Sequence, residues 1–238
     1  MTESHPFEIV QDVLIDAAPE RIWQALTEDT AAWMYPFHEA YPHERVAEEY
    51  PARLVQRMEG EGGWYNQLEY VLTPGPEGTH LHYVHSSVLT DDWERQYDAA
   101  VRHTAFYLHT LAEYLAHFDG RPVAFSEVQG PDGAAAPDAF ELLVGSLGLL
   151  GAIPGEKRDL DVPGLGPAEV TVDYLEENFL GLRTEDLMVR VFGRQAYGHR
   201  VGLTVHDFST GEGSDGDRTA KAAANAEAWS AYLEGLYG

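Results

Sequence analysis

The chain has 238 residues, of which 44% are hydrophobic and 23% are charged, as is usual for a globular protein. Its 15 basic and 40 acidic residues give a formal net charge of −25. That charge repels phosphate backbones and anionic lipid, which argues against nucleic-acid binding. The chain has no cysteine, which excludes disulfides, thiolate metal sites, iron–sulfur clusters and cysteine nucleophiles.

The distribution of apolar residues predicts a cytoplasmic protein without membrane insertion. Residues 1–6 lack the basic start and the apolar core of a signal peptide. The longest apolar stretch, residues 140–154, is interrupted by glycines and is too short to span a bilayer. The lack of cysteine fits a reducing compartment.

The first half opens with a strand that is followed by two short helices. Residues 7–15 are rich in β-branched side chains and contain no breaker, which predicts a strand. Pro19 follows two alanines and suits the first turn of a helix, where its missing N–H costs nothing. A second short helical piece is expected over residues 29–33, before Pro36.

An antiparallel meander and one long helix are expected next. Alternating apolar residues predict strands at residues 44–50, 52–59, 64–72 and 79–89. The segment from Thr73 to Gly78 is expected to be the turn between the last two strands. An apolar stripe predicts a helix from Trp93 to Phe118, ended by Gly120. This order predicts an α+β helix-grip fold, in which a curved antiparallel sheet wraps around the long helix.

The second half repeats this plan. Residues 135–141 echo residues 17–23, because an Ala-Ala-Pro-acid sequence follows a strand-like segment in both places. Further strands are expected at residues 122–128, 168–174, 179–183, 186–193 and 196–208. A last helix over residues 219–237, capped by Asp217 or Thr219, would match the long helix of the first half.

The repeated order of elements predicts two tandem repeats. We expect a helix-grip domain at residues 1–121 and a divergent second repeat at residues 122–238. The second repeat has more glycine and proline, notably over residues 143–167, so its own cavity could be collapsed.

Three stretches of the first half resemble one protein family. They are Val13–Thr27, the strand Gly78–Ser86 with its Gly-Thr start and His-Ser end, and the helix end Leu111–Leu115. Together they resemble the SRPBCC (START-like) superfamily, and within it the branch named for the C-terminal domain of the activator of the ninety-kilodalton heat-shock-protein ATPase (Aha-like). The resemblance covers residues 8–118 and implies a cavity between the sheet and the long helix. The superfamily contains lipid carriers, hormone receptors, polyketide cyclases, hydroxylase domains and co-chaperones, so the fold alone does not assign a function.

The alternation of side chains along the strands and the period of the helix indicate which residues line the implied cavity. The ligand-binding candidates are Trp33, Tyr35, Phe37, Leu54, Met58, Trp64, Leu68, Tyr83, His85, Tyr97, Val101 and Leu108. Mostly apolar walls with a few polar groups are typical of small-molecule pockets, whereas the alternative is that these residues pack a solid core. His85 is either a ligand-binding or acid–base group, or a structural histidine bonded to its neighbours.

We expect no catalytic set, no metal site and no cofactor. His80 and His82 share one strand face, opposite to Tyr83 and His85, and a metal there would need further ligands. The candidates for those ligands are His38, His43, Glu44 and Glu48. Neither a phosphate-binding loop nor a Gly-x-Ser-x-Gly elbow occurs in the sequence.

Phe106 is expected on the side of the long helix opposite its apolar stripe, beside Arg102 and His109. Two interpretations are open. The ring marks an interface between repeats, with a second copy or with a protein partner, or it is an isolated exposed phenylalanine that needs no explanation.

Three classes of function follow from these features. A non-catalytic carrier or sensor of a small apolar molecule is favoured, because aromatic residues line the expected cavity and no catalytic set accompanies them. A cyclase-type or hydrolase-type enzyme predicts a shifted histidine pKa and a pocket open to solvent. A co-chaperone-like interaction module predicts a filled cavity and an exposed apolar surface.

Overall fold

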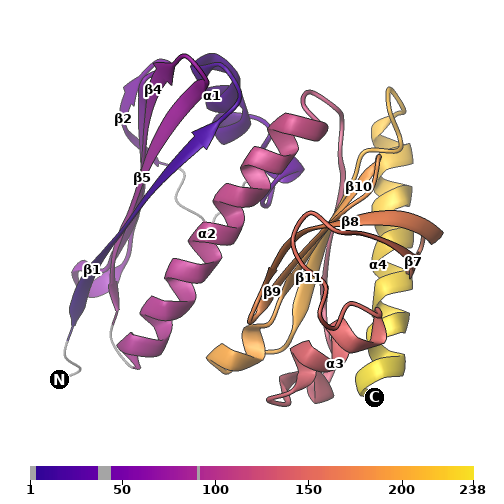
Figure 1. Ribbon diagram of the computed structural model, residues 1–238. Coiled ribbons are helices and arrows are strands. Elements are labelled where there is room, and N and C mark those ends of the chain that lie inside the picture. Colours follow the sequence, from indigo (N-terminus) through magenta and orange to yellow (C-terminus); the bar gives the residue numbers. More distant parts are fainter. Residues whose placement is uncertain (1–3, 37–43, 90–91) are drawn as a thin grey trace. The chain divides into compact units, whose positions relative to one another are not determined.

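The computed structural model describes residues 4–36, 44–89 and 92–238 (Figure 1). The chain divides into two compact units, residues 1–119 and residues 120–238, which are described one after the other. The predicted boundary after residue 121 lies two residues beyond this division.

The first unit is a five-stranded antiparallel sheet with one long helix, so the predicted α+β class and sheet-and-helix order are confirmed. The strands, in the sheet order β1-β5-β4-β3-β2, are β1 (His5–Ile15), β5 (Gly78–Leu89), β4 (Tyr65–Gly75), β3 (Arg53–Glu59) and β2 (Glu44–Glu49). The helices are α1 (Pro19–Thr27), the 3-10 turns η1 (Thr30–Ala32) and η2 (Glu61–Gly63), and α2 (Trp93–His117).

The strand β1 forms one edge of the sheet and pairs with β5 along its whole length, from His5 opposite Leu89 to Ile15 opposite Thr79. The pairing requires glycine at position 78, whose φ is +125° and where a Cβ atom would lie 2.3 Å from the carbonyl oxygen of Ile15. The expected turn over residues 73–78 was too long. The strands β4 and β5 continue to Gly75 and Gly78, because backbone pairing persists to the end of the hairpin.

The helix α1 begins where the sequence predicts, with Pro19 in its first turn. Its buried side includes Ile22, Trp23 and Leu26. The following segment is tied back to this helix, because the indole Nε1 of Trp33 donates to the carbonyl oxygen of Ala25 at 2.9 Å.

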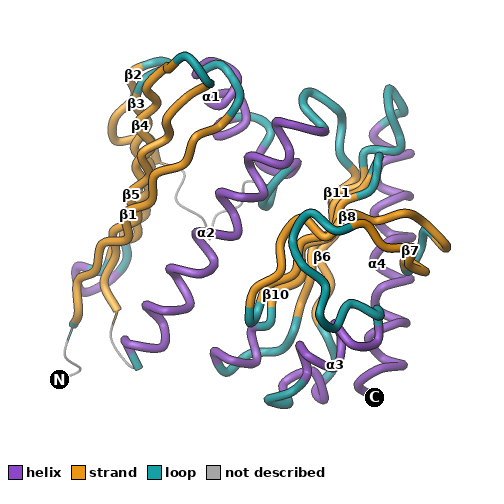
Figure 2. The backbone as a smooth tube through the Cα atoms, viewed as in Figure 1, coloured by secondary structure: helices purple, strands orange, loops and turns teal. Residues whose placement is uncertain are grey.

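The helix α2 runs along the side of the sheet that curves toward it (Figures 1 and 2). On that side Gln11 of β1 donates its amide hydrogen to the carbonyl oxygen of Val101 at 3.2 Å. The predicted stripe residues Leu108, Leu111 and Leu115 are buried.

One of the two interpretations of Phe106 on α2 was wrong. Phe106 is fully buried, with 0% exposure, so it is not an isolated exposed ring. Thr110, one turn further on, is also buried and donates its hydroxyl to the carbonyl oxygen of Phe106. The other interpretation, that this side of α2 is an interface, stays a prediction.

The second unit is a six-stranded antiparallel sheet in the order β6-β11-β10-β9-β8-β7. Its strands are β6 (Ala124–Gln129), β7 (Lys157–Val162), β8 (Gly166–Glu176), β9 (Phe179–Arg183), β10 (Leu187–Phe192) and β11 (Gly202–Asp207). Its helices are η3 (Asp132–Ala135), α3 (Ala139–Ser146), η4 (Arg194–Tyr197) and α4 (Asp215–Tyr237). In both units the first strand lies beside the last, and the remaining strands follow in reverse chain order.

Three local expectations for the second unit were wrong. The edge strand β7 was missed, because four of its six residues are charged and hide its apolar side. The expected strand over residues 196–208 begins only at Gly202, after the turn η4. Ser214, and neither Asp217 nor Thr219, caps α4, with Asp217 completing a capping box.

The core of the second unit lies between α3, α4 and one face of the sheet. Phe140 and Leu143 of α3 and Trp229 of α4 pack there against the strands. The neighbouring strands β10 and β11 are buried along their entire length. Among the described residues, no helix is long and apolar enough to cross a membrane.

Candidate ligand-binding cavity in the first unit

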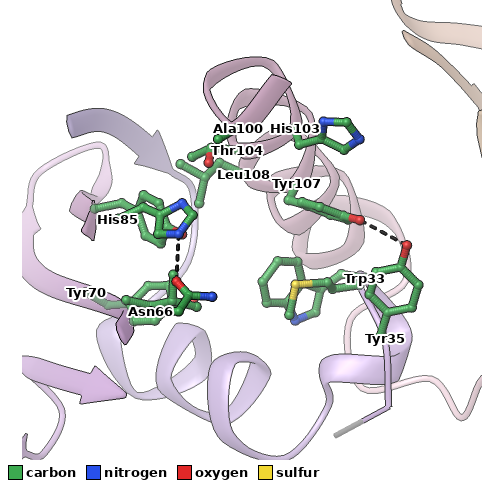
Figure 3. Close-up of a pocket in the computed structure, with 13 residues that line it drawn as sticks. Trp33, Tyr35, Asn66, Tyr70, His85, Ala100, His103, Thr104, Tyr107 and Leu108 are labelled. Carbon is green, nitrogen blue, oxygen red and sulfur yellow. Dashed lines mark hydrogen bonds between the residues drawn. The ribbon is translucent and has the colours of Figure 1, made fainter. Parts of the chain in front are cut away.

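A cavity of about 320 Å³ lies between the sheet and α2 in the first unit (Figure 3). It is lined by Trp33, Met34, Tyr35, Asn66, Leu68, Tyr70, Tyr83, His85, Ala100, His103, Thr104, Tyr107 and Leu108. Most of these side chains are aromatic or aliphatic, which is the usual character of a site for a small organic molecule.

Strand periodicity places the sheet side of the cavity. Asn66, Leu68 and Tyr70 alternate along β4 and therefore point to the same face. Leu68 lies opposite His85 and Tyr70 lies opposite Tyr83 on β5, so the two strands together make one wall.

Helix periodicity places the opposite wall. Ala100, Thr104 and Leu108 follow one another at intervals of four residues, and His103 and Tyr107 form the adjacent row. Such spacings put side chains on one side of a helix, so α2 presents a continuous surface to the cavity.

His85 is held in the cavity wall by a hydrogen bond and by burial. Its Nε2 lies 2.8 Å from Oδ1 of Asn66, and its ring meets the ring of Phe7 edge-on at 5.2 Å. Burial lowers the pKa of His85 to about 4, because the charged imidazolium would lose its hydration. The ring is therefore neutral near pH 7, and Nε2 carries the proton that it donates to the amide oxygen.

Two tyrosines from different elements meet at another part of the cavity. The hydroxyl of Tyr107 on α2 donates to the hydroxyl of Tyr35 at 3.1 Å, and their rings lie 6.1 Å apart. Figure 3 shows this pair at a distance from His85 and Asn66, so the cavity has two separate polar groupings.

Of the predicted ligand-binding residues, six line the cavity: Trp33, Tyr35, Leu68, Tyr83, His85 and Leu108. Whether any of them binds a ligand stays a prediction. Phe37 lies outside the described residues, as do His38 and His43 of the metal candidates.

The other five predicted residues do not line the cavity: Leu54, Met58, Trp64, Tyr97 and Val101. Leu54 is fully buried in β3, which lies on the far side of β4 from β5. Trp64 precedes β4 instead of lying within it. The ring of Tyr97 packs edge-on against Phe7 at 5.9 Å. Leu54 and Met58 pair with Tyr70 and Asn66 and so share their sheet face, but the cavity extends over only part of the sheet and of the helix.

Sequence reasoning did not name the remaining lining residues, although patterns in the sequence could have found several. Asn66 and Tyr70 share the parity of Leu68. Thr104 and Tyr107 belong to the same helical stripe as Leu108. They were left out because the extent of a cavity along an element cannot be read from periodicity.

The lining favours binding over acid–base chemistry. No lysine, arginine, aspartate or glutamate is among the described residues that line the cavity. A histidine with a pKa of about 4 is a weak base at pH 7, so His85 is a poor proton acceptor for catalysis. The cavity is suited to hold an uncharged molecule through packing and a few neutral hydrogen bonds.

Among the described residues, the histidines on the outer sheet face are not gathered into a metal site. His82 Nδ1 lies 2.8 Å from Oδ1 of Asp12, and both side chains are exposed. Within the described part of the chain, no three His, Asp or Glu side chains come together as metal ligands.

Several solved structures are similar to this chain. No family model and no curated protein sequence matches the chain. A solved structure of protein MLL2253 from Mesorhizobium loti is 24% identical and covers 48% of this chain and 99% of its own, with a TM-score of 0.40. DynU16, from the dynemicin biosynthetic locus, is 20% identical and covers 95% of this chain and 96% of its own, with a TM-score of 0.38.

The Aha1 dimer from Colwellia psychrerythraea is 19% identical and covers 46% of this chain and 95% of its own, with a TM-score of 0.38. All three TM-scores lie below 0.5.

Proposed function

We propose that the first unit binds a small, uncharged, largely apolar molecule in the cavity between its sheet and α2, as a non-catalytic carrier or sensor. The observation that supports this most is a cavity of about 320 Å³ whose described walls are mostly aromatic and aliphatic and carry no formally charged side chain. An apolar cavity of roughly 150 Å³ accommodates benzene, so this one has room for about two fused rings.

The aromatic lining favours a flat ligand over a flexible chain. Trp33, Tyr70 and Tyr83 are each less than a tenth exposed. The rings of Tyr70 and Tyr83 lie 5.1 Å apart. Ring edges and faces held in this way gain most from another ring that stacks on them or meets them edge-on.

Two alternatives are less well supported. The shifted histidine pKa that an enzyme predicts is present in His85, but the shift is downward, so the neutral imidazole is a weak proton acceptor near pH 7. An interaction module predicts a filled cavity, whereas the first unit has a cavity of about 320 Å³. The cytoplasmic location expected from the sequence stays a prediction.

The first test is native mass spectrometry of the freshly purified full chain, compared with its denatured mass. An added mass of a few hundred daltons that disappears on denaturation would support an occupied cavity. The binding test proper is a titration with naphthalene, followed by the fluorescence of the tryptophans and by the thermal midpoint.

A matched pair of variants ties the binding to this cavity. Ala100 lines it, so Ala100→Phe fills part of the space and is expected to weaken naphthalene binding at least about tenfold. Glu94 is exposed on the same helix and does not line the cavity, so Glu94→Phe is expected to leave binding unchanged. Failure of the wild type to bind, or equal binding by Ala100→Phe, would contradict the proposed function.

A further inference from the structure

We propose that Asn66, held in orientation by His85, donates a hydrogen bond to the ligand, so that the cavity selects neutral molecules with a carbonyl-type oxygen and rejects carboxylates. This inference rests on the proposed function, because it concerns the same cavity. It makes Asn66 a ligand-binding residue and His85 its positioning residue.

The first step is the direction of the Asn66 amide. Its Oδ1 accepts the hydrogen bond from Nε2 of His85 at 2.8 Å, so its Nδ2 group points the other way. Figure 3 shows this nitrogen directed away from His85, toward the space beside Trp33. An amide nitrogen carries two hydrogens and no acceptor, so the group offered to the cavity is a donor.

The Asn66–His85 pair is held rigidly by its surroundings. Asn66 and His85 lie on the adjacent paired strands β4 and β5. The hydroxyl of Ser87 donates to the carbonyl oxygen of Tyr65 at 2.6 Å, which ties the strands together next to Asn66. Phe7 packs edge-on against the His85 ring. The His85 imidazole is therefore held by the Phe7 ring and by the Asn66 amide. Because the imidazole is held, the amide keeps its orientation.

The third step is the charge of the walls. A carboxylate buried in the cavity would lose its hydration, and no lysine or arginine is among the described lining residues to replace it. Burial keeps His85 neutral. The other titratable lining groups are His103, whose Nδ1 lies 2.7 Å from the carbonyl oxygen of Ala99, and four tyrosines. The tyrosine hydroxyls supply hydrogen bonds but no positive charge.

Three probes of nearly the same shape separate these contributions. They are 2-ethylnaphthalene, 2-acetylnaphthalene and 2-naphthoate, which differ only in carrying an alkyl group, a ketone or a carboxylate. Dissociation constants are measured on the full chain at pH 8, above the ordinary range of histidine titration. For the wild type we expect 2-naphthoate to bind at least about 100-fold more weakly than the ketone, because a buried carboxylate has no cation beside it.

Variants test the role of each residue through the ratio of the ketone and hydrocarbon dissociation constants. Asn66→Leu is expected to shift this ratio against the ketone by about fivefold to tenfold, the effect of one neutral hydrogen bond. His85→Phe is expected to shift it in the same direction, and His85→Gln, which keeps a donor for the amide oxygen, is expected to restore it. Leu68→Val is the control, because it removes apolar volume and weakens both probes alike, leaving the ratio unchanged.

The outcomes distinguish this inference from the proposed function. If no probe binds the wild type, the proposed function and this inference are both overturned. If the ketone and hydrocarbon bind but Asn66→Leu leaves their ratio within about twofold of the wild type, only the inference is overturned, since twofold is below the effect of one hydrogen bond. Binding of 2-naphthoate as tight as that of the ketone would overturn the exclusion of carboxylates. If His85→Phe fails to fold, His85→Gln and Asn66→Leu still decide the result.

Discussion

Arg190 and Asp173 form an ion pair inside the sheet of the second unit, with Nη1 of the arginine 2.7 Å and 2.9 Å from the two carboxylate oxygens. The two side chains are 1% and 3% exposed, so neither charge retains much contact with water. Each depends on the other for compensation, because an unpaired charge in such a place loses its hydration without replacement.

Removal of one member of this pair is therefore expected to be more harmful than removal of both. Asp173→Ala should lower the free energy of unfolding of the second unit by about 3–5 kcal/mol, because it leaves a buried guanidinium without its carboxylate. The apolar double variant Asp173→Leu, Arg190→Leu should lose less. Thermal unfolding by circular dichroism, with hydrogen exchange in β8 and β10, measures the stability of the two variants. A double variant less stable than Asp173→Ala would contradict this prediction.

Gly181 is expected to tolerate no side chain, because the same ion pair passes over it. A Cβ atom there would lie 2.3 Å from Oδ1 of Asp173 and 2.5 Å from Nη1 of Arg190. Gly181→Ala should cost about 1–3 kcal/mol in unfolding free energy, as overpacked sites do. Gly235 in α4 is the matched control. It has no atom within 4 Å of an added Cβ, so Gly235→Ala should be neutral or slightly stabilising. Equal thermal midpoints for both variants would rule out this role of Gly181.

The buried His85 predicts a specific loss of stability in acid. Its pKa is lowered to about 4 in the folded chain, while an unfolded histidine titrates near 6.5. Between these values the unfolded state binds a proton that the folded state does not. Stability therefore falls as the pH drops from about 6.5 to 4, and this contribution levels off below 4.

The variant His85→Gln isolates this effect, because it does not titrate. Between pH 7.5 and pH 4.5 the wild type should lose about 2–3 kcal/mol more unfolding free energy than His85→Gln, from the size of the pKa shift. Denaturant unfolding at both pH values measures the difference, and the ring resonances of His85 should titrate near pH 4. Parallel losses in the two proteins would contradict the assigned pKa.

The start of α4 depends on Ser214. Its hydroxyl accepts from the backbone N–H of Asp217 at 3.2 Å, and the Asp217 carboxylate accepts from the backbone N–H of Ser214 at 2.8 Å. Ser214→Ala should cost about 1 kcal/mol, as loss of an N-cap usually does. Thr219→Ala is the control, since the Thr219 hydroxyl only donates to a carbonyl oxygen within the helix. Hydrogen exchange in the first turns of α4 distinguishes them, and a larger effect for Thr219 would refute the cap.

Much of the first unit could be predicted from its sequence, because local patterns carry the information. Strand alternation placed Leu68, Tyr83 and His85 on one sheet face, and the helical stripe placed Leu108 opposite them. Pro19 marked the first turn of α1. These signals depend only on spacing along the chain, so they survive without knowledge of the tertiary structure.

Contacts between distant residues were decided by tertiary structure alone. The Asn66–His85 bond spans 19 residues and the Tyr35–Tyr107 bond spans 72, and each depends on strand register or on where a loop meets a helix. Periodicity indicates which residues share a side of an element but not whether that side is covered. For this reason the sequence left two interpretations of Phe106 open, and the extent of the cavity was overestimated toward Leu54.

The sequence by itself therefore determined the class of fold, the order of its elements and the apolar character of the candidate site. The tertiary structure decided which polar groups meet in that site, and it paired Arg190 with Asp173. The physical reason is that secondary structure and amphipathicity arise from neighbours along the chain, whereas hydrogen-bond partners and desolvation arise from residues that only packing brings together.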